Sequence, residues 1–304
     1  MEYLIGSHDP KSVIELDLSH DVLTFVPAKL GQFVNLQKLW LNDNKLTSIS
    51  VKFGQLVNLQ KLSLSWNQLT SITAKLGQLV NLQELFLNDN KLTSIPAELG
   101  QLVNLEKLYI GFNRLTSIPP EFGQLVKLQV LSFSGNKLTS IPAELGKLVN
   151  LWELRLNNNR LTSIPPELGQ LVKLRELSLS NNQLTSIPPE LGQLVKLRDI
   201  WLSWNKLTSI PPELGQLVKM QKLGLNNNKL TSIPAELGQL TNLQYLYINN
   251  FLHIGKTITD IPYIRTLTRL RKHQYIMGKN TIVLQVNRRR QITLLNVEAM
   301  VSYG

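Results

Sequence analysis

The chain has 304 residues, of which 43% are hydrophobic, and it carries a net charge of +11 with no cysteine. The absence of cysteine excludes a disulfide framework, a thiolate zinc site and any enzyme with a cysteine nucleophile. The charge is uneven, because residues 253–304 hold nine Lys/Arg against two Asp/Glu, whereas the remaining residues hold 23 against 19. The body of the chain is therefore mildly basic and its tail strongly basic.

The start of the chain has no basic segment followed by a long apolar run, so we do not expect it to be a secretory signal. No stretch reaches the roughly 18 consecutive apolar residues of a membrane span. The sequence also lacks an N-x-S/T sequon. Together these features predict an intracellular, soluble protein located in the cytoplasm.

Residues 1–12 are expected to be a lead-in that caps the N-terminal end of the core. Tyr3, Leu4 and Ile5 supply apolar side chains that could cover an open end. The segment 9–12, Asp-Pro-Lys-Ser, has the composition of a turn.

A pattern of 23 residues then repeats from Val13 to Asn242, and residues 36–49 show it as L-x-x-L-x-L-x-x-N-x-L-x-x-I. The ten full copies begin at Val13, Leu36, Leu59, Leu82, Leu105, Leu128, Leu151, Leu174, Leu197 and Met220, and a partial copy begins at Leu243. A period of this length predicts a solenoid in which each repeat packs on its neighbours.

The pattern within one repeat predicts its local structure. Alternation at Leu39, Trp40 and Leu41 predicts a short strand with Trp40 facing outward. The asparagine at position 9, such as Asn44, is expected to form a ladder that satisfies backbone groups. The Pro-x-Glu-Leu-Gly segment predicts a short helical or 3₁₀ turn, with its glycine serving a tight turn of the backbone.

The consensus L-x-x-L-x-L-x-x-N-x-L-T-S-I-P-x-E-L-G-Q-L-x-x resembles the leucine-rich repeat of the Ras-suppressor-like and plant Ras-group-related class. It is also similar to the expanded repeat families of large DNA viruses of amoebae, for which the location would be the host cytoplasm. The resemblance implies an α/β solenoid, a leucine-rich repeat arc with a parallel concave sheet and short helical or 3₁₀ turns on the convex side. The repeats would occupy residues 13–252.

Residues 253–304 are expected to form a basic C-terminal cap. Phe251 takes the asparagine position of the last copy, and a helix is predicted at about 261–277. Two β-prone runs, residues 281–286 and 291–297, predict a hairpin. That hairpin could shield the end of the core or offer an edge strand to a partner.

The repeats differ from one another mainly at positions 2, 3, 5, 7 and 8, which we expect to face outward. All five tryptophans lie at these positions. Exposed aromatic side chains are typical of protein-binding surfaces. The alternation of large and small residues at position 5 further predicts pockets between ridges. The residues expected to bind a partner protein are Trp40, Trp66, Phe86, Tyr109, Phe112, Trp152, Arg155, Trp201, Trp204 and Tyr247.

Other interpretations of these residues stay open at this stage. The aromatic side chains could simply suit a β-sheet, or the face could bind a second copy of the chain as a homodimer. The tail run Arg288, Arg289 and Arg290 could bind phosphate groups of nucleic acid or of an anionic surface. A row of Lys and Arg at position 10 is expected to be a solvated rim or to attract an acidic partner.

No catalytic constellation is evident in the sequence. The four histidines, His8, His20, His253 and His273, have no phased acidic partner, and no P-loop or G-x-G-x-x-G motif is present. Asp17 and Asp21 near His20 are expected to be a polar edge rather than a metal site. We therefore expect a non-catalytic protein without a cofactor or metal.

Overall fold

The structure is a computed structural model that describes residues 9–249, 281–286 and 292–294. The chain forms two compact units, Met1–Leu154 (unit 1) and Arg155–Gly304 (unit 2). The predicted N-terminal cap residues Tyr3, Leu4 and Ile5 and the predicted helix at 261–277 lie outside the described residues.

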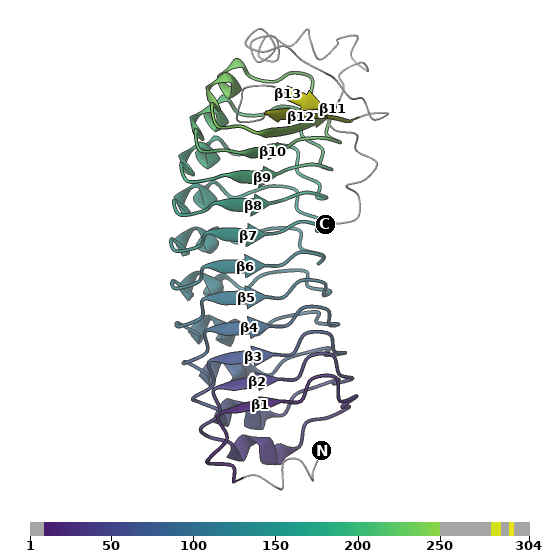
Figure 1. The fold of residues 1–304 in the computed structure, drawn as a ribbon, viewed down its shortest axis with the longest axis vertical. Coiled ribbons are helices and arrows are strands. Elements are labelled where there is room, and N and C mark those ends of the chain that lie inside the picture. Colours follow the sequence, from purple (N-terminus) through teal and green to yellow (C-terminus); the bar gives the residue numbers. More distant parts are fainter. Residues whose placement is uncertain (1–8, 250–280, 287–291, 295–304) are drawn as a thin grey trace. The chain divides into compact units, whose positions relative to one another are not determined.

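Unit 1 alternates short strands with five-residue 3₁₀ helices (Figure 1). Its strands are β1 (Glu15–Asp17), β2 (Lys38–Trp40), β3 (Lys61–Ser63), β4 (Glu84–Phe86), β5 (Lys107–Tyr109) and β6 (Val130–Ser132). Its 3₁₀ helices are η1 (Ala28–Gln32), η2 (Val51–Gln55), η3 (Ala74–Gln78), η4 (Ala97–Gln101), η5 (Pro120–Gln124) and η6 (Ala143–Lys147). Strand β7 (Glu153–Arg155) contains the boundary between the units.

Unit 2 continues the same alternation and ends in three longer or irregularly spaced strands. Its strands are β8 (Glu176–Ser178), β9 (Asp199–Trp201), β10 (Lys222–Gly224), β11 (Tyr245–Asn249), β12 (Thr281–Val286) and β13 (Ile292–Leu294). Its 3₁₀ helices are η7 (Pro166–Gln170), η8 (Pro189–Gln193), η9 (Pro212–Gln216) and η10 (Ala235–Gln239).

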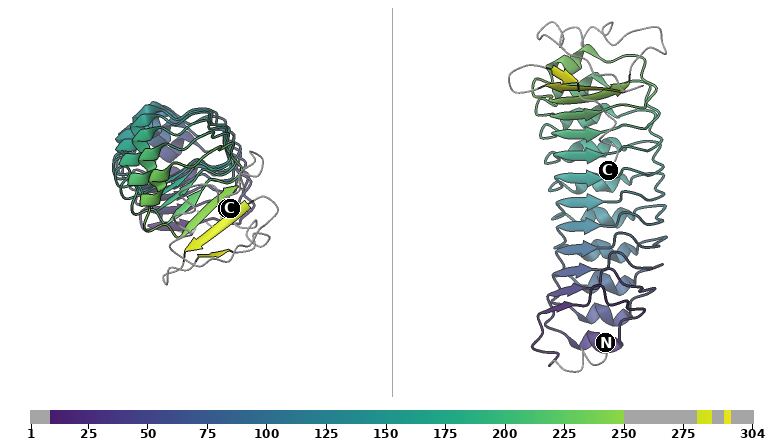
Figure 2. Two further views of the ribbon diagram at one scale, coloured as in Figure 1. Left: turned by 90° about the horizontal axis from the view of Figure 1, so that it is seen from above. Right: turned by 45° about the vertical axis from the view of Figure 1, so that its right-hand side comes forward.

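Equivalent residues of successive repeats pair with one another in parallel strands. Leu39 pairs with Leu62 in unit 1, and Ile200 pairs with Leu223 in unit 2. Within each unit the 3₁₀ helices lie on a different side of the coils from the strands (Figure 2). Each unit is thus built as an α/β solenoid, and the predicted fold class is confirmed.

The core of each unit is a stack of the repeated Leu and Ile side chains. In the repeat that begins at Leu59, the side chains of Leu59, Leu62, Leu64 and Leu69 are 0% exposed. Burial of this much apolar surface in every repeat is the main stabilising term, at roughly 25 cal/mol per Å² removed from water. The leucines and isoleucines of the pattern therefore define the frame.

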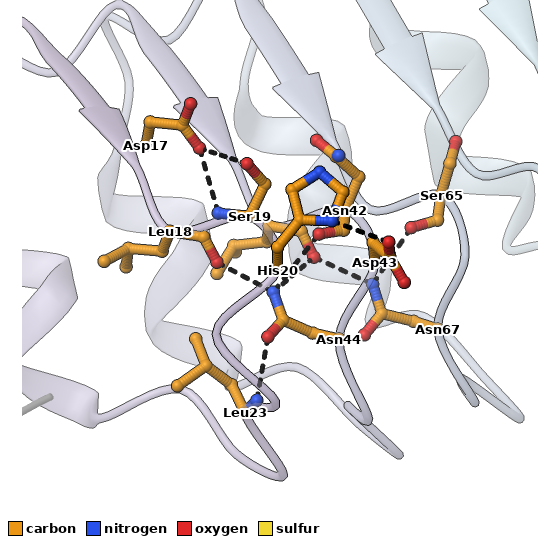
Figure 3. A network of polar contacts seen from close by, with 11 residues as sticks. Asp17, Leu18, Ser19, His20, Leu23, Asn42, Asp43, Asn44, Ser65 and Asn67 are labelled. Carbon is orange, nitrogen blue, oxygen red and sulfur yellow. Dashed lines mark hydrogen bonds and ion pairs between the residues drawn. The ribbon is translucent and has the colours of Figure 1, made fainter.

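The asparagines at position 9 form the expected ladder, which Figure 3 shows at the N-terminal end of unit 1. Asn67 donates from Nδ2 to the carbonyl oxygens of Leu41, at 2.9 Å, and Leu64, at 3.1 Å. Its Oδ1 accepts the backbone N–H of Leu46 at 2.9 Å. One buried amide thus satisfies backbone groups of two adjacent repeats.

The glycine at position 19 has a different role from the predicted one. Gly100 and Gly192 have no positive φ; a Cβ on them would lie 2.6 Å from the carbonyl oxygens of Glu121 and Glu213 in the next repeat. The prediction of a tight turn was wrong. Glycine is needed because adjacent 3₁₀ helices approach each other too closely for a side chain.

Strand β12 coincides with the first β-prone run of the tail, residues 281–286, and β13 covers part of the second, residues 291–297. Strand β12 pairs antiparallel with β11, and β13 pairs antiparallel with β12. The backbone edge of β11 is therefore covered by the chain's own strand.

Candidate functional site

The open face of the sheet in unit 1 carries aromatic side chains at repeat position 5. Trp40, Phe86 and Tyr109 are half-buried, so their outer edges meet solvent. Ser63 stands in register between Trp40 and Phe86 and is only 8% exposed. A short side chain between tall neighbours is shielded by them. The aromatic row on this face is therefore interrupted at Ser63, between Trp40 and the pair Phe86 and Tyr109.

Phe86 and Tyr109 form the centre of this face. Their rings stack with centroids 5.3 Å apart and an interplanar angle of 5°. The Nζ atom of Lys61 lies 5.3 Å from the centroid of the Phe86 ring, within the range of a cation–π contact. The Phe86 ring is thus in contact with both Tyr109 and Lys61.

Glu84 links two lysines beside this pair. Its carboxylate lies 2.8 Å from Lys61 Nζ and 2.9 Å from Lys107 Nζ. Partial burial alone would raise the pKa of Glu84, but the hydrogen bonds from Lys61 and Lys107 outweigh it and hold that pKa below its usual value. The hydrogen bond with Glu84 also raises the pKa of Lys107. These shifts favour the charged forms of Glu84 and Lys107.

Three further aromatic residues occupy a backbone position that the sequence did not reveal. Trp66, Phe112 and Trp204 have φ values of 56°, 52° and 58°, in the left-handed region. Their side chains are 62%, 54% and 61% exposed. They stand at repeat position 8, where the other residues with positive φ are His20, Asp43, Asp89, Gly135, Asn158, Asn181 and Asn227.

Left-handed backbone is unfavourable for bulky side chains and is well tolerated by Gly, Asn and Asp. The prevalence of Asn and Asp at position 8 was a signal in the sequence for this conformation. Trp66, Phe112 and Trp204 are therefore strained residues whose side chains are more than half exposed.

In unit 2 the aromatic side chains gather around Trp201 and Tyr247. Their ring centroids are 5.4 Å apart, and Tyr245 stacks on Tyr247 at 6.4 Å. A Cβ at Gly224, which lies between them in register, would be 2.7 Å from the Trp201 ring. The predicted pocket at this small residue is thus filled by the indole, and that prediction was wrong for Gly224.

The surroundings of this cluster are partly charged. Lys222 Nζ lies 2.9 Å from Asp199 Oδ2, and this hydrogen bond raises the pKa of Lys222. Burial raises the pKa of the Tyr247 hydroxyl. The remaining predicted site residues are Trp152, half-buried in unit 1, and Arg155, exposed at the start of unit 2. The structure thus divides the predicted residues into a set on each unit.

Not every position expected to face outward does so. Val130 at position 3 is 1% exposed, and Ser134 at position 7 is 5% exposed. Apolar and short side chains in these rows can be covered by larger neighbours, and the charged Glu153 at position 3 is buried as well, at 4% exposed. At position 10, Lys91 and Lys206 donate hydrogen bonds to the interrupting Gln68 and Gln183.

The first repeat forms the expected polar edge. His20 Nδ1 lies 2.6 Å from Asp43 Oδ2, which stands one repeat later at the same position, so the expectation that no histidine has a phased acidic partner was wrong for His20. Asp17 accepts hydrogen bonds from the hydroxyl and backbone N–H of Ser19 (Figure 3). The Ser19 hydrogen bonds lower the pKa of Asp17. Among the described residues, no group of three His, Asp or Glu side chains is placed to hold a metal ion.

A second row of amides was missed by the sequence interpretation. At position 23, Asn58 and Asn81 each donate to the carbonyl oxygen of a valine 24 residues earlier, both at 2.9 Å. Together with glutamines at position 2, these asparagines line a polar hollow of about 410 Å³ in unit 1; its residues are Gln37, Asn58, Gln60, Asn81, Gln83 and Asn104. The mixture of Asn and Lys at position 23 obscured the pattern.

The basic tail residues Arg288, Arg289 and Arg290 lie outside the described residues. In the part of the chain that the structure does describe, no helix is long and apolar enough to span a membrane.

Two family models match the chain. One, described as a leucine-rich repeat region, matches residues 70–190. The other, described as two copies of leucine-rich repeats, matches residues 34–79, 172–216 and 218–263. A comparison with curated proteins gave no match.

Several solved structures of receptors are similar to the chain. The plant peptide hormone receptor RGFR1 in complex with RGF2 is 35% identical, with a TM-score of 0.66 over 72% of this chain and 36% of that one. A TDR receptor is 30% identical, with a TM-score of 0.72 over 78% of this chain and 43% of that one. The Arabidopsis receptor kinase HAESA, in complex with the peptide hormone IDA and the co-receptor SERK1, is 29% identical, with a TM-score of 0.62 over 76% of this chain and 45% of that one. The chain therefore spans less than half the length of each receptor chain.

Proposed function

Because the chain belongs to the leucine-rich repeat proteins, we propose that it binds a partner protein, without catalysis, through the open face of its sheet. The contact residues are the aromatic sets on the two units. In unit 1 the central residues are Phe86, Tyr109 and the strained pair Trp66 and Phe112. In unit 2 they are Trp201, Trp204 and Tyr247.

The observation that carries this proposal is the left-handed backbone of Trp66, Phe112 and Trp204. A left-handed residue with a side chain costs roughly 1–2 kcal/mol relative to its ordinary conformation. Asn and Gly occupy the same repeat position elsewhere, so the fold does not require an aromatic residue there. Strain that the fold does not need is typical of functional sites.

The geometry of the two sets also favours binding. The stacked rings of Phe86 and Tyr109 and the packed rings of Trp201 and Tyr247 are held by neighbours before any partner arrives. A surface that is already ordered loses little conformational entropy on binding. Tryptophan and tyrosine are also the residues that most often dominate binding energy at protein interfaces.

The similar solved structures support a protein or peptide partner. RGFR1 and HAESA are each described as complexes, the first with RGF2 and the second with the peptide hormone IDA and a co-receptor. Mixed charges beside the aromatic residues, such as Glu84 between Lys61 and Lys107, disfavour nucleic acid, whose binding surfaces are uniformly basic.

The repeat consensus further supports assignment to the intracellular Ras-suppressor-like class, with a cytoplasmic location. A viral source, from a family of amoebal DNA viruses, is the corresponding proposal for its origin. Imaging of the tagged protein in the source cells tests the location, since a secreted protein would appear in the medium instead.

The binding face is tested with a variant that replaces the three strained residues by asparagine, W66N/F112N/W204N. Partners are captured on the immobilised full chain and compared by mass spectrometry. We expect the variant to lose the partners that the unsubstituted protein captures. A control variant, V103N/V126N/V195N, removes exposed valines from another row and should keep them. Equal capture by both variants would show that the face is not the binding site.

Self-association is the main competing function for the same face. The molar mass in solution, measured at two protein concentrations, distinguishes self-association from binding of a different protein. A mass that doubles with concentration in the unsubstituted protein, and not in the asparagine variant, would assign the face to a homodimer.

A further inference from the structure

The row that forms a neutral amide hollow in unit 1 is strongly basic in unit 2. At repeat position 23 unit 1 has Asn in every copy except Lys127, and at position 2 it has mostly Gln, whereas unit 2 has three lysines and two arginines in these rows before they return to Gln221 and Asn242. We call these residues the basic strip: Lys173, Arg175, Lys196, Arg198 and Lys219. All five are exposed.

The members of the strip are close together because adjacent repeats are joined at this position. The backbone N–H of Arg198 donates to the carbonyl oxygen of Arg175 at 2.8 Å. Backbones of paired strands lie about 4.8 Å apart, so successive strip residues are neighbours. Like charges placed opposite one another in this way repel and destabilise the fold.

For four of the five strip residues, no ion pair among the described residues offsets this repulsion. In the part of the chain that the structure describes, Arg175, Lys196, Arg198 and Lys219 take part in no ion pair and no side-chain hydrogen bond. By contrast, Lys222, which stands at the neighbouring repeat position 3, forms an ion pair with Asp199. Arg175, Lys196, Arg198 and Lys219 are therefore four positive charges with no ion-pair partner in the described part of the chain.

Lysine at position 23 also gives up a hydrogen bond that the fold offers. Asn242 in the next repeat donates to the carbonyl oxygen of Val218 at 2.7 Å, as Asn58 does to Val34 in unit 1. Lys196 and Lys219 make no such bond. Lys196 and Lys219 therefore lack a hydrogen bond that asparagine would make, and they lie beside other positive charges. Their presence indicates a role in recognition rather than in stability.

We propose that the basic strip binds an acidic segment of a protein, rich in Asp and Glu, in an extended form. The strip is narrow, because along each coil it lies between a 3₁₀ helix that carries a glutamate, such as Glu190 in η8, and a strand that carries an acid, such as Asp199 in β9. A peptide can follow a narrow cationic row, whereas the wider phosphate backbone of nucleic acid would meet these carboxylates. This inference stands on unit 2 alone and does not depend on the aromatic face.

The test uses the full chain and a fluorescein-labelled polyglutamate peptide, with binding followed by fluorescence anisotropy at several salt concentrations. The strip variant, K173N/R175Q/K196N/R198Q/K219N, carries the residue types that unit 1 has in this row. The control variant, R114Q/K137Q/R160Q/K206Q/K229Q, removes five positive charges from position 10, where Gln68 and Gln183 occur naturally.

We expect the strip variant to weaken peptide binding at least about tenfold and the control variant to change it less than about threefold. The affinity of the unsubstituted protein should fall as salt is raised. Equal losses in both variants, or no binding by the unsubstituted protein, would overturn the proposal. So would tighter binding of duplex or single-stranded DNA than of the peptide, with the same dependence on the strip.

Further measurements test whether a loss of peptide binding comes from the strip itself, rather than from unfolding or from another site. Circular dichroism of the strip variant should match that of the unsubstituted protein, since Asn and Gln are already part of this fold in unit 1. The variant W204N should bind polyglutamate normally while losing partners of the open face. A loss of polyglutamate binding in R288Q/R289Q/R290Q, with none in the strip variant, would instead assign peptide binding to the tail and overturn the strip.

Discussion

Unit 1 and unit 2 have the same frame and different surfaces. In both, Leu and Ile side chains fill the core and a buried asparagine joins each repeat to the one before it. Beside the strands, however, unit 1 presents amides such as Gln60 and Asn81, whereas unit 2 presents Arg175 and Lys196. Because unit 1 folds with the amides and unit 2 folds with the cations, the fold requires neither kind of residue at these positions. The difference between them therefore points to residues that act on other molecules.

The strongest test of the shared frame is the removal of one ladder asparagine from each unit. Asn67→Ala leaves the buried N–H of Leu46 and carbonyl of Leu41 without that partner, and Asn205→Ala does the same to Leu184 and Leu179. Each unsatisfied buried group costs about 1–3 kcal/mol, so we expect each variant to lose about 2–5 kcal/mol of unfolding free energy.

Urea unfolding of the two variants measures this loss. Asn58→Ala is the control, because Asn58 is exposed and makes one hydrogen bond, to Val34. It should lose about 1 kcal/mol or less. A loss at Asn67 that is much larger than the loss at Asn205 would show that the two frames are not equivalent.

A smaller loss is expected when the close contact between 3₁₀ helices is disturbed. Alanine at Gly100 in unit 1 or Gly192 in unit 2 would place a Cβ 2.6 Å from a backbone carbonyl oxygen. Forcing an extra carbon into a packed site costs about 1–3 kcal/mol. Thermal unfolding should show similar decreases for the two variants, and no decrease in either would mean that the helices can move apart freely.

The sequence predicted the frame well because each frame residue meets its own equivalent one repeat away. Leu39 pairs with Leu62, so a period of 23 residues is enough to place the strand and its inward side chains. The outward direction of Trp40 and Trp201 followed from the same alternation.

Other features depend on geometry that the alternation does not contain. The positive φ of Trp66 was signalled only by Asn and Asp at the same position of other repeats, and the role of Gly100 is set by the distance between repeats. The packing of Trp201 over Gly224 depends on the direction in which one ring leans. These are the features that distinguish the candidate binding residues from ordinary exposed aromatics, and they required coordinates.

Asparagine at position 8 should stabilise either unit slightly. Trp66→Asn and Trp204→Asn relieve left-handed strain, while the lost side chains were more than half exposed. We expect the unfolding free energy to rise by about 1 kcal/mol. The reverse substitution, Asn181→Trp, should lower it by a similar amount. A marked loss of stability in Trp204→Asn would mean that the tryptophan serves the fold, and the argument from strain would then fail.

The smallest expected effect is the pH dependence of the stability that Glu84 and its two lysines contribute to unit 1. The pKa of Glu84 is lowered in the folded chain, chiefly by hydrogen bonds from Lys61 and Lys107 that outweigh partial burial. A carboxyl with a lowered folded pKa stabilises the fold above its unfolded pKa, and this stabilisation is lost as pH falls through the folded pKa. Because the lysine side chains are 35% and 39% exposed, we expect a contribution below about 1 kcal/mol.

Glu84→Gln should therefore unfold slightly more easily than the unsubstituted protein at pH 7 and equally easily in acid, in urea unfolding at both pH values. If the two proteins differ by the same amount at both pH values, the hydrogen bonds and not the charge of Glu84 hold the lysines beside Phe86.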